Sequence, residues 1–218
     1  MAIDAANAYR IPEQVDFEAG ALTEPAAVCL ESFYRAGFQK GWTVLIMGDG
    51  TFGFIHAMLA RILGAEKIIV AGHYDERLER INEITDAITC NTHNEDLTEL
   101  LGEHIDTAGA DMAIEATGAG PVVNIALNAL RPRGTLILFS YVWSPEITDL
   151  GLVHMKEVNV LGACRSLGCF ERCIELIQNK QLDLASLIDI KVPLEEVAAA
   201  MEKLTTDKKN TFKAVLVP

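Results

Sequence analysis

The feature that most constrains the fold is the stretch TVLIMGDGTFGFIHAMLARILGA, residues 43–65, in which a glycine turn separates two different apolar patterns. The four consecutive apolar residues Val44–Met47 predict a strand that is buried on both faces, because a strand wetted on one face would alternate. After the turn, apolar residues recur at helical spacing from Ile55 to Leu63, and Gly64 supplies a stop. The sequence therefore predicts a strand, a tight turn and a helix in that order.

The turn has the pattern Gly-x-Gly-x-x-Gly, formed by Gly48, Gly50 and Gly53 and completed by Thr51 and Phe52. The first glycine allows the turn, the second lets the backbone approach a pyrophosphate, and the third lets the helix pack closely on the strand. The N–H groups at the helix N-terminus then face the phosphates. The pattern in this context predicts a dinucleotide site, with a purely structural turn as the alternative.

Asp49 is an oddity inside this loop, because a carboxylate there must point away from bound phosphates or weaken their binding.

The charge balance limits the class of partner. The chain has 18 Lys and Arg against 31 Asp and Glu, a net charge of −13, which argues against nucleic acid and against an anionic membrane surface. We expect neither a membrane span nor a secretory leader, because apolar runs of the required length and flanks are lacking. The five cysteines form no Cys-x-x-Cys pair, so reduced thiols and a cytoplasmic location are expected.

The rest of the chain alternates between strand and helix patterns. Further strands are predicted at residues 67–71, 87–90, 112–116, 135–139 and 158–164, with helices at 75–84, 95–101 and 122–130 and a turn at 131–134. A last helix follows with Phe170, Cys173, Ile174 and Ile177 on one face. Six strands in such a cycle predict an α/β fold with a doubly wound parallel sheet, the Rossmann fold.

The two ends of the chain do not fit this cycle. We expect an interdomain lead at residues 1–22, a dinucleotide-binding domain at 23–187 that opens with a helix over 23–37, and a C-terminal return segment at 188–218. The return segment is expected to hold a helix at 194–204 and a final strand at 212–217. Such terminal pieces usually belong to a neighbouring domain.

Several separated segments resemble the zinc-type medium-chain alcohol and polyol dehydrogenases. In chain order they are AANAYRIPEQVDFEAGALTEPAAV, GDGTFG, EATGAG, HMKEVNVLGACRS and QNKQLDLASLIDIKVPLEEVAAAMEKL. The resemblance implies the NAD(P)(H)-binding part of an oxidoreductase that moves hydride between a nicotinamide cofactor and a small alcohol, polyol or carbonyl substrate. It also implies that the family's catalytic domain, which holds the catalytic zinc, is missing here. We therefore expect no catalytic residue in this chain, and no activity from it alone.

The resemblance also implies roles for single residues. Thr117 and Ser140 follow two strands and are expected beneath the nicotinamide half, and Arg165 near the nicotinamide and pyrophosphate, its alternative being a surface arginine. Glu24, of a Glu-Pro pair, is expected near the zinc in the full-length parent only; its alternative is an acid at a helix N-terminus. Residues 149–154, DLGLVH, resemble the family's edge strand, which predicts a homodimer.

Cofactor choice depends on the stretch KIIVAGHYDERLER. In NAD-binding members of this fold an acidic residue ends the second strand and accepts hydrogen bonds from the ribose, whereas that position here is Gly72, followed by His73 and Tyr74. One turn further on, Arg77 is placed to pair with a 2′-phosphate while Tyr74 lies along the adenine. The sequence predicts NADP, with NAD as the alternative if Arg77 merely packs on the adenine.

Other functions stay open at this point. A methyltransferase that uses S-adenosylmethionine also places glycines after a first buried strand, but it requires the acidic residue that is absent at Gly72. A stand-alone nucleotide-binding or regulatory module without catalysis is a second alternative, and a zinc-free reductase of the same superfamily is a third.

Overall fold

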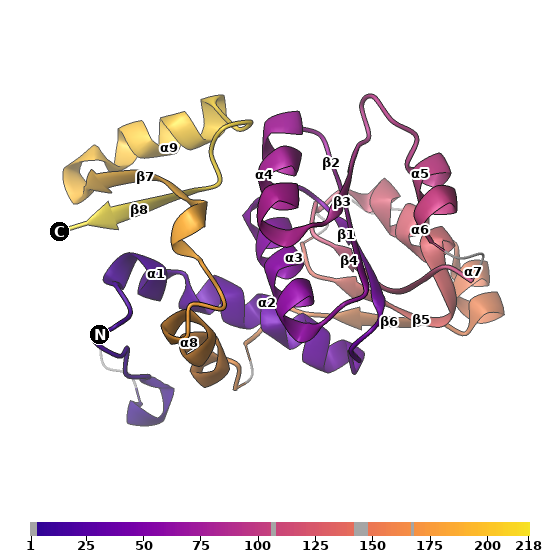
Figure 1. Ribbon diagram of the computed structural model, residues 1–218, viewed down its shortest axis with the longest axis horizontal. Coiled ribbons are helices and arrows are strands. Elements are labelled where there is room, and N and C mark those ends of the chain that lie inside the picture. Colours follow the sequence, from indigo (N-terminus) through magenta and orange to yellow (C-terminus); the bar gives the residue numbers. More distant parts are fainter. Residues whose placement is uncertain (1–3, 106–107, 142–147, 167) are drawn as a thin grey trace. The chain divides into compact units, whose positions relative to one another are not determined.

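The computed structural model of the protein describes residues 4–105, 108–141, 148–166 and 168–218, which form two compact units (Figure 1). One unit comprises Ser32–Cys164, and the other comprises residues 1–31 together with Arg165–Pro218. Helix α2, Thr23–Ala36, contributes residues to both. The domain boundaries at 22/23 and 187/188 stay predictions.

The unit Ser32–Cys164 is built on a six-stranded parallel sheet in the order β3-β2-β1-β4-β5-β6. Its strands are β1 (Thr43–Met47), β2 (Lys67–Gly72), β3 (Ile88–Asn91), β4 (Ala110–Glu115), β5 (Leu130–Leu138) and β6 (Asn159–Gly162). From β1 the chain adds β2 and β3 toward one edge of the sheet, and then returns to the other side of β1 to add β4, β5 and β6. The strand order therefore reverses between β1 and β4. This confirms the predicted doubly wound fold, in which ligands bind at such a reversal.

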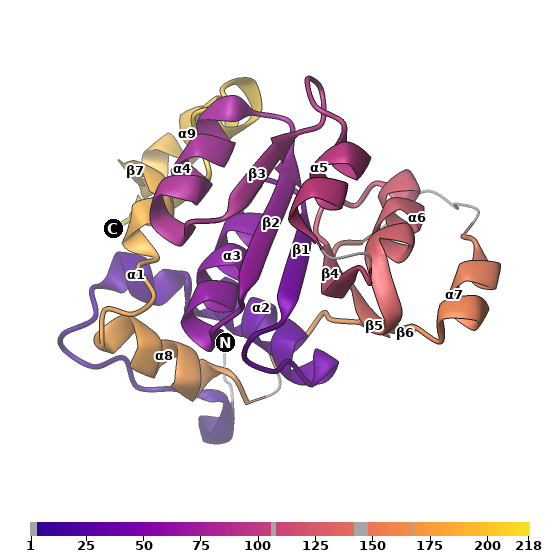
Figure 2. The same cartoon turned by 45° about the vertical axis from the view of Figure 1, so that its right-hand side comes forward.

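Helices cover both faces of this sheet (Figure 2). Helices α3 (Thr51–Leu63) and α4 (Asp75–Thr85) lie on one face, and α5 (Leu97–His104) and α6 (Gly120–Ala129) lie on the other. The alternation of side chains along a strand explains how β1 serves both layers. Leu45 and Met47 pack in one buried cluster with Val123 and Leu127 of α6, while Val44 and Ile46 point to the opposite side.

Helix α3 ends where the sequence predicts. Gly64 adopts the left-handed conformation, with a φ of 85°, and its N–H donates hydrogen bonds to the carbonyls of Ala60 and Arg61. A residue without a Cβ takes this conformation at little cost, which is why glycine stops helices.

The predicted edge strand at residues 149–154 is wrong, because this segment forms helix α7, Leu150–Lys156. The carboxylate of Asp149 caps the helix by accepting hydrogen bonds from the N–H groups of Gly151 and Leu152 at 2.9 and 3.2 Å. Leu152 and Val153 then pack against the buried cluster of the sheet. The short apolar run fits either period, and capping with tertiary packing decides for helix.

The turn predicted at residues 131–134 lies within β5 instead. The strand begins at Leu130, and its pairing with β4 shifts register between Ala110 and Met112 before it continues from Thr135. Arg133 has a φ of 61°, so the backbone does bend locally, but pairing on both sides of the bend keeps the segment in the sheet.

The second unit holds the two ends of the chain. Its smaller elements are η1 (Ala5–Asn7), α1 (Phe17–Ala21), α8 (Phe170–Gln178) and η2 (Ala185–Leu187). Strands β7 (Ile188–Pro193) and β8 (Lys213–Val217) pair in parallel and are joined by η3 (Leu194–Glu196) and α9 (Val197–Thr206). Among the described residues of either unit, no helix is both long and apolar enough to span a bilayer.

Candidate functional site

The glycine turn after β1 has the geometry that its sequence predicts. Gly48 has a φ of 127°, which residues with a side chain rarely adopt. A Cβ on Gly53 would lie 1.9 Å from the carbonyl oxygen of Gly48, so only glycine lets α3 approach the turn this closely. A Cβ on Gly50, in contrast, would meet no protein atom within 4 Å. The fold itself explains two of the three glycines, and the third faces open space.

That open space belongs to a cavity of about 940 Å³ at the carboxyl ends of β1, β2, β3 and β4. Gly50 is the N-cap of α3 and offers no side chain to cover the helix N-terminus. Six of the residues expected to bind cofactor line the cavity: Gly48, Gly50, Gly72, His73, Arg77 and Thr117. Thr51, Phe52, Gly53, Tyr74 and Ser140 lie in the same elements or loops but outside this lining. The crevice and the strand-order reversal thus coincide.

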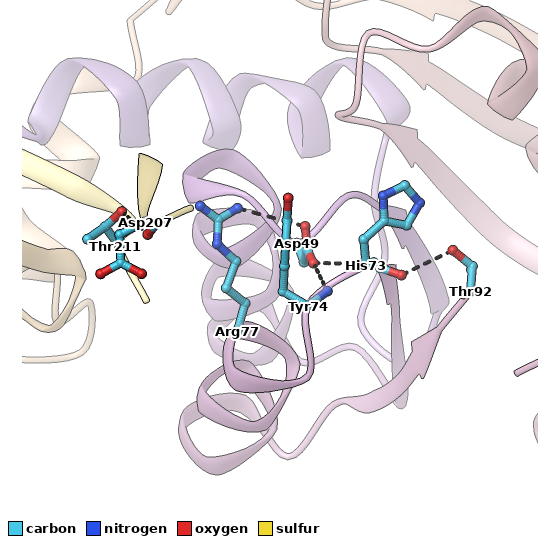
Figure 3. A network of polar contacts seen from close by, with 8 residues as sticks. Asp49, His73, Tyr74, Arg77, Thr92, Asp207 and Thr211 are labelled. Carbon is cyan, nitrogen blue, oxygen red and sulfur yellow. Dashed lines mark hydrogen bonds and ion pairs between the residues drawn. The ribbon is translucent and has the colours of Figure 1, made fainter. Parts of the chain in front are cut away.

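Asp49 connects the turn to the end of β2 (Figure 3). Its side chain is about 12% exposed, and its Oδ2 accepts hydrogen bonds from the N–H groups of His73 at 2.7 Å and Tyr74 at 2.9 Å. Its Oδ1 lies 3.9 Å from a guanidinium nitrogen of Arg77, whose Cζ is 5.3 Å from the centre of the Tyr74 ring. The sequence left open whether this carboxylate points away from bound phosphates or weakens their binding, and the structure turns it toward the β2–α4 loop.

Asp49 also explains the glycine at the end of β2. A Cβ on Gly72 would lie 2.4 Å from the Cβ of Asp49 and 2.6 Å from its Oδ2, far inside normal contact distance. The parallel register pairs Met47 with Ala71, so the residues that follow Met47 and Ala71 along the chain lie side by side. The missing acid at Gly72 is therefore accompanied by an acid that reaches the same place from the neighbouring strand.

Sequence reasoning missed the contribution of β3 to this cavity. Thr92, His93 and Asn94 line it from the segment after β3, and the ring centres of His73 and His93 are 4.3 Å apart. The Thr92 hydroxyl donates a hydrogen bond to the carbonyl of Gly72 at 3.1 Å, which ties this segment to the end of β2. The predicted doubly wound strand order could have indicated this contribution, because it places β3 directly beside β2.

Glu115, at the end of β4, organises the loop that contains Thr117. It is fully buried, and its Oε1 accepts hydrogen bonds from the N–H groups of Thr117 and Gly118 and from the Thr117 hydroxyl, at 2.6 to 2.7 Å. The Thr117 hydroxyl in turn accepts a bond from the N–H of Ala119. The hydroxyl of Thr117 is therefore used inside the loop, and its predicted contact with a cofactor stays a prediction.

His56 lies beneath the turn, in the second turn of α3, and is fully buried. Its Nδ1 lies 2.7 Å from the carbonyl oxygen of Phe52, which only accepts, so Nδ1 carries the proton. Its Nε2 then accepts from the hydroxyl of Ser32 at 3.2 Å. Burial lowers the pKa of His56 from 6.5 to about 4, the hydrogen bond to Phe52 opposing this shift, so the ring is neutral at pH 7.

Two of the predicted site residues lie in the unit that comprises residues 1–31 and Arg165–Pro218. Glu24 is exposed in the first turn of α2, and Arg165 is exposed after β6. Their expected places near a zinc ion and near the nicotinamide stay predictions. Among the described residues, no group of three or more His, Cys, Asp or Glu side chains is arranged to hold a metal ion. These residues do not fit a zinc centre, so no chemical step through zinc is derived from them.

A sequence model described as zinc-binding dehydrogenase matches residues 52–179 of the chain. Among its relatives, a putative D-xylulose reductase from Rhizobium meliloti is 31% identical over 209 residues, and the sorbitol dehydrogenase of Gallus gallus is 28% identical over 216 residues. The matches cover 96% and 97% of this chain and 60% of each relative. The chain thus spans about three fifths of the length of these relatives.

Solved structures with the same fold include two with a bound nicotinamide cofactor. A short chain alcohol dehydrogenase from Escherichia coli, complexed with NADH, superposes with a TM-score of 0.92 at 22% identity over 99% of this chain and 64% of its own. A putative zinc-binding dehydrogenase from Sinorhizobium meliloti, bound to NADP, gives 0.82 at 22% identity over 96% and 60%.

Proposed function

The chain belongs to the zinc-binding dehydrogenase family, and from this premise we propose that it is the NAD(P)(H)-binding part of an alcohol or polyol dehydrogenase. The observation that carries the proposal is the cavity at the strand-order reversal, into which the uncapped N-terminus of α3 opens beside Gly50. Backbone N–H groups and the helix dipole favour an anion at such an end.

We propose an order for the parts of a dinucleotide along the cavity and the loops beside it. We place the pyrophosphate at Gly48, Gly50, Thr51 and Phe52, over the start of α3. The adenosine ribose then lies at the end of β2, beside Gly72 and His73. The nicotinamide half extends toward the loops after β4 and β5, where Thr117 and Ser140 lie. These assignments follow from the general position of ligands at the carboxyl ends of parallel strands.

In the full-length protein we propose hydride transfer between the nicotinamide and a small alcohol, polyol or ketone. A family zinc ion, when bound in a separate catalytic domain, would supply the polarisation of the substrate oxygen. The residues of this chain would bind and orient the cofactor, which is the share of catalysis that a protein contributes to cofactor chemistry. We expect no turnover from the present chain alone.

Ligand binding distinguishes one alternative, a methyltransferase, which would bind S-adenosylmethionine. A stand-alone nucleotide-binding module would bind the dinucleotide as the present proposal also expects, and it would differ by having no catalytic partner domain. Membership of the dehydrogenase family disfavours the methyltransferase. The homodimer and the cytoplasmic location stay predictions, and the homodimer no longer rests on a strand at residues 149–154, since these residues belong to α7 and its cap.

The test uses calorimetric titration of the protein with NADH, NADPH and S-adenosylmethionine at pH 8. We expect at least one dinucleotide to bind, and Gly50→Val to abolish its binding, because the added side chain occupies the space proposed for the pyrophosphate, while its Cβ meets no protein atom within 4 Å. Gly102→Val is the matched control, since a Cβ on Gly102 also meets no atom within 4 Å but lies in α5, outside the cavity lining. Dinucleotide binding that survives Gly50→Val would refute this placement.

A further inference from the structure

We infer that Asp49, in the glycine turn, is the residue that selects NAD(H) over NADP(H) in this chain. The inference rests on the proposed function, and it reverses the cofactor that Gly72 and Arg77 predict from the sequence. It assigns to a residue of the β1–α3 turn the task that an acid at the end of β2 performs in NAD-binding Rossmann folds.

The first argument is position. The Asp49 carboxylate lines the cavity and bonds to the N–H groups of His73 and Tyr74, the two residues that follow β2 (Figure 3). A 2′-phosphate bound at the end of β2 would need donors of this kind. Since Asp49 already accepts from both N–H groups, a phosphate would have to displace a carboxylate that is hydrogen-bonded and nearly buried.

The second argument is charge. Arg77 is the cation on which a 2′-phosphate would depend, but its guanidinium lies 3.9 Å from Asp49, with both side chains almost covered. The carboxylate therefore offsets the charge that would attract the phosphate and adds a repulsion of its own. A ribose 2′-hydroxyl, in contrast, is a donor, and an ionised carboxylate with about four lone-pair sites can accept it in addition to the two backbone bonds.

The third argument is mutual exclusion between positions 49 and 72. A Cβ on Gly72 would lie 2.4 Å from the Cβ of Asp49, so in this backbone only one of the two positions carries a side chain. The glycine at the end of β2 then reflects the space that Asp49 occupies and gives no sign of a phosphate site. The carboxylate of Asp49 comes from the turn after β1 and lies at the end of β2, where the acid of NAD-binding Rossmann folds lies.

The test measures dissociation constants for NADH and NADPH by calorimetry at pH 8. We expect the wild type to prefer NADH by about ten- to a hundred-fold, the range of one charge-assisted hydrogen bond. Asp49→Asn keeps the shape but removes the charge, and should reduce this preference at least ten-fold. Glu79→Gln is the matched control, because it removes one charge from an exposed position of α4 and should leave the ratio unchanged.

A transfer experiment separates selectivity from a merely structural role. The double variant Asp49→Gly with Gly72→Asp moves the carboxylate to β2 and removes the clashing Cβ, so it should restore a preference for NADH of at least ten-fold, whereas Asp49→Gly alone should not. A wild type that prefers NADPH would overturn the inference, and so would Asp49→Asn if it weakened both cofactors equally. Failure of the wild type to bind either cofactor at millimolar concentration would instead refute the proposed function.

Discussion

The buried His56 should make the stability of the protein depend on pH in a way that a single substitution removes. Burial lowers its pKa to about 4 in the folded chain, whereas an unfolded chain has the ordinary value of 6.5. The unfolded state therefore binds the proton more tightly. The stability contributed by the neutral ring is fully present above about pH 7.5 and is lost as the pH falls from the unfolded pKa toward the folded one.

The magnitude follows from these two values. At pH 5 the unfolded ring is almost fully protonated and the folded ring is almost fully neutral. The two states therefore differ by about one bound proton over roughly 1.5 pH units, from the unfolded pKa of 6.5 down to pH 5. At 1.36 kcal/mol for each unit, the free energy of unfolding should fall by about 2 kcal/mol between pH 8 and pH 5 because of His56 alone. The neighbours of the ring are not acidic at the described contacts, since it lies against Phe33, Phe139 and the hydroxyl of Ser32.

Urea unfolding of the wild type and of His56→Gln at pH 8 and pH 5, with a thiol reductant present, would measure this effect. Other groups titrate in the same range, but they do so in both proteins, so the difference between the two pH dependences isolates His56. The wild type should lose about 2 kcal/mol more than the variant. Equal losses in the two proteins would refute the reasoning.

Two other predictions concern groups that hold loops around the sheet. Glu115→Ala should lower the free energy of unfolding by about 1.5–3 kcal/mol in urea titrations, because the N–H groups of Thr117 and Gly118 lose their carboxylate acceptor; a change below 1 kcal/mol would contradict this. Lys156→Met should cost about 1–2 kcal/mol, since the Lys156 ammonium donates to three carbonyls at the end of α6, at 2.7 to 3.1 Å. Lys208→Met, at an exposed lysine, is its control, and an equal effect of the two substitutions would count against the capping role.

The sequence by itself determined the features that depend on neighbours along the chain. The buried run Val44–Met47, the glycine turn and the helix up to Leu63 form as predicted, because strand and helix periods and glycine conformations are local properties. Their repetition predicted the doubly wound sheet, since parallel strands joined by helices have few other arrangements. The segment 149–154 shows the limit: its short apolar pattern fits both periods, and packing of Leu152 and Val153 on the sheet decided for helix.

Only the tertiary structure decided how the candidate site is composed. Gly72 and Asp49 are 23 positions apart in the sequence. Taken alone, Gly72 lacks the acid expected at the end of β2, and Asp49 is an acid in a loop where none is expected. The parallel register that pairs Met47 with Ala71 brings both into one space, where their side chains exclude each other. The same sheet order brings Thr92 to Gly72. Contacts between strand ends arise from pairing across the sheet, and a pattern read along one segment does not contain them.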